Sequence, residues 1–277
     1  MEGTSPQPVY LFIDNEGVEL REAHHYWGRG TITVEKALKR DLGQEFQIAA
    51  VGPAAENLVR FACINHDFGR QAGRGGIGTV MGAKKLKAIA VRGTKRVPVA
   101  DVGRYHSLSQ EMFKACRNSE GLEVWQRYGT AGITTWSNEV GAFPTRNFQS
   151  GAMDGYEMVS GETMRSKLVV ADKACFACPT PCGKYSYSRK YEAYVEGPKY
   201  ETTALLGGNC GLERIDEIAY ANYLCDEYGL DTIAAGNVIG FAMECFERGI
   251  IDTADTDGVR LKESSPCSRE SPCGRGL

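Results

Sequence analysis

The chain has 277 residues, of which 42% are hydrophobic, and a formal net charge of −3. This length suffices for one large or two modest domains, and the balanced charge gives no sign of nucleic-acid binding. No apolar run approaches the roughly 18 residues of a membrane helix, and residues 1–8 lack the basic and apolar regions of an export signal. We therefore expect a cytoplasmic protein that binds neither membranes nor nucleic acid.

The first hundred residues are predicted to be rich in strands. Apolar segments that flank the turn sequence Asp14–Gly17 indicate a hairpin. A helix is expected to begin with Thr31 or Thr33 as its N-cap and to end at Gly43. The expected strands are residues 9–13, 18–20, 46–51 and 87–91.

From about residue 101 the pattern becomes helical, as in residues 215–228, where apolar side chains recur on one helical face. The expected helices are residues 102–116, 122–128, 162–170, 215–228 and 232–248. The predicted units are residues 1–100, residues 101–262, and an aberrant or disordered tail at 263–277 that is rich in Pro, Ser and Cys. The sequence thus predicts an α+β fold, with a β-rich N-terminal domain followed by a mainly α-helical domain.

Three of the ten cysteines stand close together in the sequence. Cys175, Cys178 and Cys182 have the spacing C-x2-C-x3-C, and Pro179 and Pro181 between the last two exclude a helix there. Such a loop can direct several thiolates at one object, and thiolates suit Fe–S clusters or zinc. The spacing favours three ligands of a [4Fe–4S] cluster. Zinc, or structural or redox thiols, remain as alternatives.

A glycine-rich basic segment covers residues 70–95, with seven basic residues and no acidic one. Glycines let backbone N–H groups approach an anion and arginines bind phosphate in a bidentate manner, which favours a phosphate-bearing cofactor. The run Gly73-x-Gly75-x-x-Gly78 matches the dinucleotide fingerprint, but a strand is expected after it and not before it, so we reject that site. The plainer alternative is a flexible, solvated loop.

Five ordered motifs resemble the tungsten-containing aldehyde:ferredoxin oxidoreductase family, over nearly the whole chain up to Lys262. They are Gly52–Arg60 with Ala72–Val91, the Cys175–Cys182 loop, Gly197–Thr202, Asn209–Gly211, and Cys225–Thr232. The resemblance implies a β-rich domain that cradles the cofactor beneath mainly helical domains. It also implies a [4Fe–4S] cluster and a tungsten (or molybdenum) centre held by two pterins.

The resemblance also implies roles for individual residues. Glu201 would lie near the metal as the catalytic residue, and the cluster ligands would be Cys175, Cys178 and Cys182. The cofactor-binding residues would be Arg70, Ala72, Gly73, Arg74, Gly75, Gly76, Asp226, Gly229, Leu230 and Asp231. Taken alone, Glu201 reads as a surface carboxylate, Gly229 as the end of a helix, and Cys210 and Cys225 as core thiols.

The activity that the resemblance implies is oxidation of an aldehyde to a carboxylic acid, with electrons passed through the cluster to ferredoxin. The partners are then a small aldehyde and ferredoxin, with a homodimer as one option. We expect an incomplete chain, because the family's opening strands and its third domain are absent, together with the fourth cluster cysteine and a second pterin motif. The alternatives are a non-catalytic Fe–S or zinc module and an inactive gene fragment.

Overall fold

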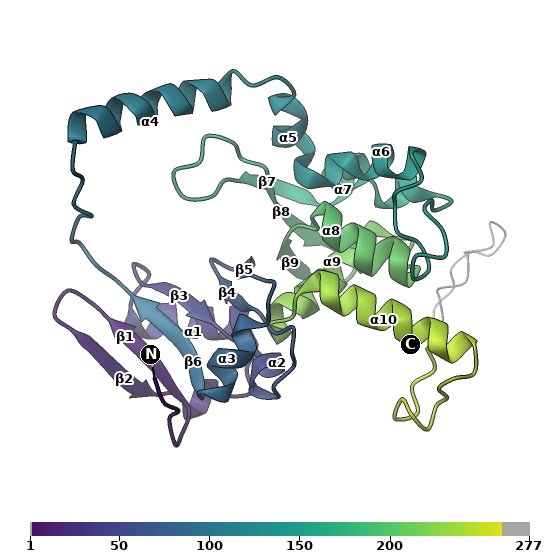
Figure 1. Ribbon diagram of the computed structural model, residues 1–277, viewed down its shortest axis with the longest axis horizontal. Helices are drawn as coiled ribbons and strands as arrows, with labels where there is room; N and C mark the ends of the chain where they lie inside the picture. The colour runs from purple at the N-terminus through teal and green to yellow at the C-terminus, as the bar shows by residue number, and fades with distance from the viewer. Residues whose placement is uncertain (1, 262–277) are drawn as a thin grey trace.

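A six-stranded mixed sheet forms the N-terminal part of the computed structural model, which describes residues 2–261 (Figure 1). The strand order is β2-β1-β6-β3-β4-β5, and β1 runs parallel to β6 while the other neighbours are antiparallel. The strands are β1 (Val9–Ile13), β2 (Val18–Glu22), β3 (Gln47–Ala50), β4 (Ile64–His66), β5 (Arg70–Ala72) and β6 (Leu86–Val91). The predicted hairpin and the strands near residues 46–51 and 87–91 are confirmed, whereas β4 and β5 were not expected.

Helix α1 (Thr31–Leu42) covers one face of this sheet and buries Val34 and Leu38 against Phe46. Gly43 ends the helix as predicted, and its N–H donates to Lys39 O at 3.0 Å. The prediction of a threonine N-cap is wrong, because the N-cap is Gly30 and makes no side-chain cap bond. The short helices α2 (Pro53–Glu56) and α3 (Ile77–Ala83) pack on each other beside the sheet.

The remainder of the chain is mainly helical, which confirms the predicted α+β class (Figure 1). Helices α9 and α10 match the predicted ranges to within one residue. The helices are α4 (Val102–Arg117), α5 (Leu122–Tyr128), α6 (Thr134–Glu139), α7 (Gly161–Lys167), α8 (Tyr200–Thr202), α9 (Ile215–Tyr228) and α10 (Thr232–Glu247). The tail predicted at 263–277 lies outside the described residues.

A small antiparallel sheet interrupts these helices, in the order β7 (Val169–Lys173), β8 (Gly183–Ser188) and β9 (Ala193–Glu196). The prediction of one helix over 162–170 is therefore wrong in its last residues, because α7 ends at Lys167 and Val169 begins β7. β-Branched Val169 and Val170 suit a strand, and β8 supplies the hydrogen-bond partners. The three clustered cysteines lie between β7 and β8, in residues 174–182, which we call the thiol loop.

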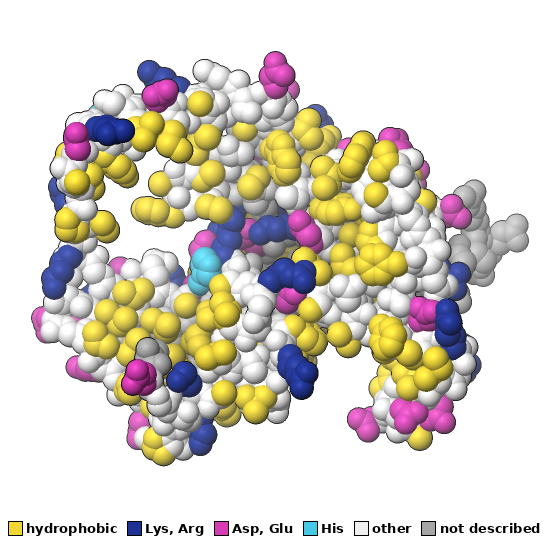
Figure 2. All heavy atoms as spheres, viewed as in Figure 1, with side chains coloured by type: hydrophobic (Ala, Val, Ile, Leu, Met, Phe, Trp, Pro, Cys, Tyr) yellow, Lys and Arg dark blue, Asp and Glu magenta, His cyan; other side chains and the backbone are white. Residues whose placement is uncertain are grey.

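Helix α4 stands apart from the rest of the molecule, and none of its residues is buried (Figure 1). In the space-filling view an opening separates α4 from the strands and the thiol-loop side of the molecule (Figure 2). Its exposed apolar side chains include Tyr105, Leu108 and Met112. Among residues 2–261, no helix has the length and apolar composition that crossing a membrane requires.

Candidate cofactor site

The strand-rich and helical parts meet at the carboxyl end of α9. The backbone oxygen of Asp226 accepts hydrogen bonds from Thr31 Oγ1 and Asn65 Nδ2, each at 2.7 Å. Leu230 forms an isolated antiparallel bridge with Ala62. The last turn of α9 and the residues after it are thus bonded directly to the strand-rich part. Charged side chains of both signs gather at this junction (Figure 2).

Two glycines allow this close approach. Gly229 ends α9 with a φ of 72°, as predicted for a helix end, and a Cβ there would lie 2.8 Å from Gly52 N. A Cβ on Gly52 would lie 2.3 Å from Tyr228 O. Any larger side chain at either position would push α9 away from the strand-rich part.

Asp226 links the two parts through its side chain as well. Its carboxyl group is buried and accepts hydrogen bonds from Gln71 Nε2 at 2.6 Å and Asn222 Nδ2 at 2.9 Å. Burial raises the pKa of Asp226 well above the ordinary 3.8, the bond from Gln71 opposes this rise, and the charge of Glu196 adds to it. Asp226 therefore fixes β5 against α9, and β5 leads into residues 73–76, which we call the glycine-rich loop.

Replacing Asp226 with asparagine is expected to change how stability depends on pH. A carboxyl whose pKa is raised on folding stabilises the fold fully below about pH 3.8, and this contribution is lost as the pH rises through the folded-state pKa. Asparagine stays neutral, and the Gln71 amide can rotate to keep a hydrogen bond. Urea unfolding of both proteins across pH should show the variant gaining relative to the native chain as pH rises. A pH-independent difference would contradict this assignment.

Asp231 also has a structural partner. Its carboxylate caps α10 by accepting from Ile233 N at 3.3 Å and Ala234 N at 3.2 Å. The carboxyl groups of Asp226 and Asp231 are thus both engaged within the chain. The buried thiols Cys210 and Cys225 are core residues as expected, and burial raises the pKa of each to about 12.

Arg70 connects the start of the glycine-rich segment to the thiol loop, and its side chain is only 13% exposed. Its Nη1 lies 2.9 Å from Cys175 Sγ, and its Nε lies 2.8 Å from Glu196 Oε2. The Glu196 carboxylate is fully buried and also pairs with Lys173 at 3.2 Å and with Lys199 at 3.6 Å. Lys173 also pairs with Asp67 at 3.1 Å, so three cations face two carboxylates in this network, and one of the cations, Arg70, reaches Cys175.

The thiol loop presents its sulfur atoms at the surface. Cys175 and Cys178 are exposed, Cys182 is half-buried, and all three are free thiols. The loop is turned by hydrogen bonds from Cys178 N to Cys175 O at 3.0 Å and from Cys182 N to Thr180 O at 2.9 Å. Within residues 2–261, no three His, Cys, Asp or Glu side chains converge on a common point as a metal site. The donors fit a thiophilic group in number and softness, on a loop that lacks helical or strand structure.

The glycine-rich loop follows β5 and leads into α3. The expectation that no strand precedes it is wrong, but β5 is an edge strand antiparallel to β4, so the parallel βαβ unit of a dinucleotide site is absent here. Gly76 has a φ of 69°, and a Cβ there would lie 2.1 Å from Arg60 O. Ala72, Arg74 and Gly75 are exposed, so this edge of the loop is accessible to a ligand.

Glu201 lies in the single turn of α8 and is exposed. Its neighbours anchor that turn, since Tyr200 Oη lies 2.6 Å from Ser137 Oγ and Thr202 Oγ1 lies 3.0 Å from Thr232 Oγ1. The contacts thus place α8 against α10 but give Glu201 itself no partner among residues 2–261.

Sequence reasoning overlooked four residues that organise the site. They are Gln71, Lys173, Glu196 and Asn222. Only Glu196 left a signal in the sequence, as a carboxylate that directly follows the apolar Val195 and precedes Gly197-Pro198. The other three become recognisable only from their contacts.

Two family models match the chain in order. Residues 1–93 match the N-terminal domain of aldehyde ferredoxin oxidoreductase, and residues 107–267 match domains 2 and 3 of the same family. The matched residues include the glycine-rich loop, the thiol loop and the end of α9.

Individual relatives agree with this match. The tungsten-containing aldehyde ferredoxin oxidoreductase of Pyrococcus abyssi is 45% identical over 263 residues, which cover 93% of this chain and 43% of that protein. That of Thermococcus kodakarensis is 43% identical, with 91% and 42% covered. Among solved structures, the active site complex BamBC of benzoyl coenzyme A reductase superimposes with a TM-score of 0.75 at 28% identity, with 94% and 41% covered. The chain spans less than half the length of these relatives, and it belongs to the aldehyde ferredoxin oxidoreductase family.

Proposed function

We propose that this chain acts in a cytoplasmic oxidoreductase that oxidises aldehydes to carboxylic acids at a tungsten- (or molybdenum-) pterin centre and passes the electrons to ferredoxin. The main support is the position of Arg70, which joins the glycine-rich segment to Cys175 and Glu196 through one guanidinium group. A cofactor on the glycine-rich loop and a cluster on the thiol loop would then be held against each other. Family membership supports the same reaction.

In this proposal the thiol loop supplies Cys175, Cys178 and Cys182 as three ligands of a [4Fe–4S] cluster. Such a cluster accepts and releases single electrons. Arg70 would donate to the Cys175 sulfur, and this hydrogen bond would stabilise negative charge on the thiolate. Hydrogen bonds to cluster sulfurs raise the reduction potential, so Arg70 would tune the potential as well as position the loop.

The pterin would lie on the glycine-rich loop, where Arg70, the Ala72–Gly76 backbone and Arg74 would hold its ring or phosphate. A phosphate matches the paired N–H groups of arginine. Asp226 and Asp231 are bonded within the chain, and we assign them positioning roles. Together with Gly229 and Leu230 they fix the angle between α9, α10 and the loop.

Glu201 is proposed as the group that takes a proton from, or orients, the water that attacks the aldehyde. Its exposure leaves the carboxylate accessible to a substrate on the outer side of α8.

We further propose residues 1–100 and 101–262 as separate domains, supported by the extended, exposed segment at residues 92–101.

The test is the metal and pterin content of the protein that contains this chain, purified without oxygen from cells supplied with tungstate and molybdate. We expect tungsten or molybdenum, released pterin fluorescence, and aldehyde-dependent reduction of a viologen dye.

Arg74→Ala should lower the retained pterin at least threefold after gel filtration, because the phosphate loses a bidentate partner. The control Arg117→Ala removes an exposed arginine from α4 and should retain pterin. Zinc as the sole metal would instead identify a non-catalytic module.

A further inference from the structure

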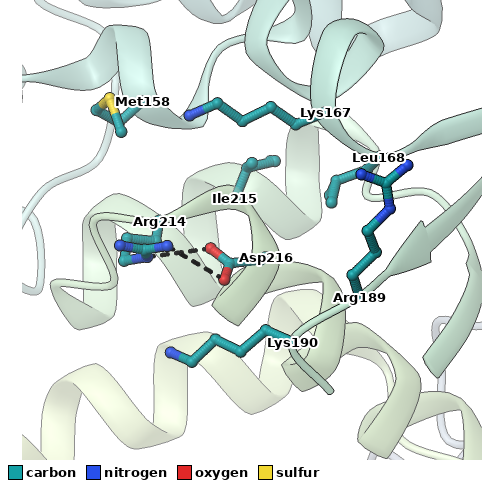
Figure 3. A pocket seen from close by; sticks show the side chains of 8 residues that line it. All are labelled: Met158, Lys167, Leu168, Arg189, Lys190, Arg214, Ile215 and Asp216. Atoms are coloured by element: carbon teal, nitrogen blue, oxygen red, sulfur yellow. Dashed lines mark hydrogen bonds and ion pairs between the residues drawn. The ribbon is translucent and has the colours of Figure 1, made fainter. Parts of the chain in front are cut away.

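A second candidate site lies on the helical part, in a pocket of about 240 Å³ (Figure 3). It is formed where the end of α7, the turn after β8 and the start of α9 meet. The lining residues are Met158, Lys167, Leu168, Arg189, Lys190, Arg214, Ile215 and Asp216. Strand β8 separates this pocket from the thiol loop, since Cys182 precedes the strand and Arg189 follows it. At about 3.3 Å per residue these two lie roughly 20 Å apart, so the pocket is distinct from the proposed cofactor site.

The charge of the lining is strongly positive, with four cations and one carboxylate. Figure 3 shows the four basic side chains around the opening, where Lys167 projects from α7, Arg189 and Lys190 from the turn after β8, and Arg214 from the residue before α9. Arg214 pairs with Asp216 at 3.2 Å, and Lys190 pairs with Glu217 at 3.2 Å. Lys167 and Arg189 make no ion pair with any residue between 2 and 261. A pocket lined by cations in excess of carboxylates attracts anions, so the lining favours a negatively charged ligand.

The inner wall of the pocket is apolar. Leu168 and Ile215 are 5% and 2% exposed, and Met158 contributes its side chain at the rim. A purely inorganic anion would leave these surfaces without a partner, whereas an organic anion could bury a carbon skeleton on them. The volume corresponds to about eight water molecules at about 30 Å³ each, which limits the ligand to a small molecule.

We propose that this pocket binds a small organic anion with at least two negative charges, carried by a phosphate or by carboxylates, on a compact apolar body. The negative charges would contact Lys167 and Arg189, and the apolar body would lie on Leu168 and Ile215. Because the pocket is remote from the thiol loop, binding there does not depend on the cofactors.

The experiment measures binding of phenyl phosphate and of phthalate to the 277-residue chain by isothermal titration calorimetry, with inorganic phosphate as the probe that lacks an apolar body. We expect one site per chain, and at least fivefold tighter binding of one organic dianion than of inorganic phosphate. Which of the two dianions binds more tightly distinguishes a phosphate from a dicarboxylate ligand. Equal affinity for all three probes would overturn the role of the apolar wall.

The variant Lys167→Gln/Arg189→Gln should weaken binding at least tenfold. Both side chains are exposed and without ion pairs to the described residues, so the fold should persist, which the melting temperature checks. The control Lys95→Gln/Arg96→Gln removes the same charge from the exposed segment after β6. Met158→Ala provides a second readout, because it should weaken phenyl phosphate but not inorganic phosphate. Equal losses of affinity in the two double variants would show that only the net charge matters, and would overturn the site. Binding of a polyglutamate peptide without any binding of the small dianions would overturn it as well.

Discussion

Replacement of Cys178 by serine is expected to remove the Fe–S cluster from the thiol loop. Cys178 is an exposed free thiol at the middle of the C-x2-C-x3-C sequence, and its Sγ lies 3.7 Å from Thr180 O. A thiolate binds iron strongly, whereas a serine hydroxyl is a hard, weakly acidic donor, so the loop would keep only two good ligands. After anaerobic reconstitution of the native chain we expect about four iron atoms and four sulfides, with an external thiol as the fourth ligand. In Cys178→Ser both should fall below about a tenth of that.

The matched control is Cys116→Ser on α4. Cys116 is also an exposed free thiol but lies on a helix that is separate from the loop, so iron and sulfide should be retained. Iron, sulfide and the broad visible absorption are measured together. Unchanged iron and sulfide in Cys178→Ser would exclude the loop as the cluster site. Uptake of zinc without sulfide by the native chain would favour the zinc alternative.

The second large effect concerns stability, with Lys87→Met expected to lower the free energy of unfolding by about 3–5 kcal/mol. Lys87 lies in β6, inside the sheet that carries β5, and its side chain is fully buried. Its Nζ lies 2.5 Å from Glu56 Oε1 and 2.7 Å from Arg29 O. Burial lowers the pKa of Lys87 and the Glu56 partner opposes this, so the charged form depends on the pair. Methionine would fill the space but leave the Glu56 carboxylate buried without its cation.

A second substitution distinguishes the loss of the charge pair from a packing defect. Glu56 also accepts from Gly28 N at 2.7 Å, and glutamine can keep that bond, so Lys87→Met/Glu56→Gln should recover most of the lost stability. Lys36→Met on the exposed face of α1 controls for the added methionine and should change stability by less than about 0.5 kcal/mol. Urea unfolding gives each value. If Lys87→Met loses no more unfolding free energy than the control, or if the double variant does not recover that loss, the Lys87–Glu56 pair contributes little to stability.

Several features of the protein were determined by sequence alone, because their causes are local. The β1–β2 hairpin follows from two apolar segments around Asp14–Gly17, and α9 and α10 follow from helical periodicity with Gly229 and Asp231 at their boundaries. The thiol loop follows from cysteine spacing and its prolines. The ordered motifs were also sufficient to identify the family, which the family models confirm.

Other features were decided only by the tertiary structure. Strands β4 and β5 have three residues each, too few for an alternating pattern, and they exist because β3 and β4 offer hydrogen-bond partners. Thr31 does not cap α1, because its hydroxyl is bonded to Asp226 O, 195 residues away.

The centre of the candidate site has the same long-range origin. Arg70 meets Cys175 across 105 residues, and Gln71 meets Asp226 across 155. Nothing in the local sequence of either partner encodes these contacts, since their formation requires closing long loops, a cost that only the packing of the two parts together offsets. The sequence alone therefore predicts which residues carry the chemistry. The tertiary structure determines which of them meet and which, like Asp226 and Asp231, are bonded within the chain.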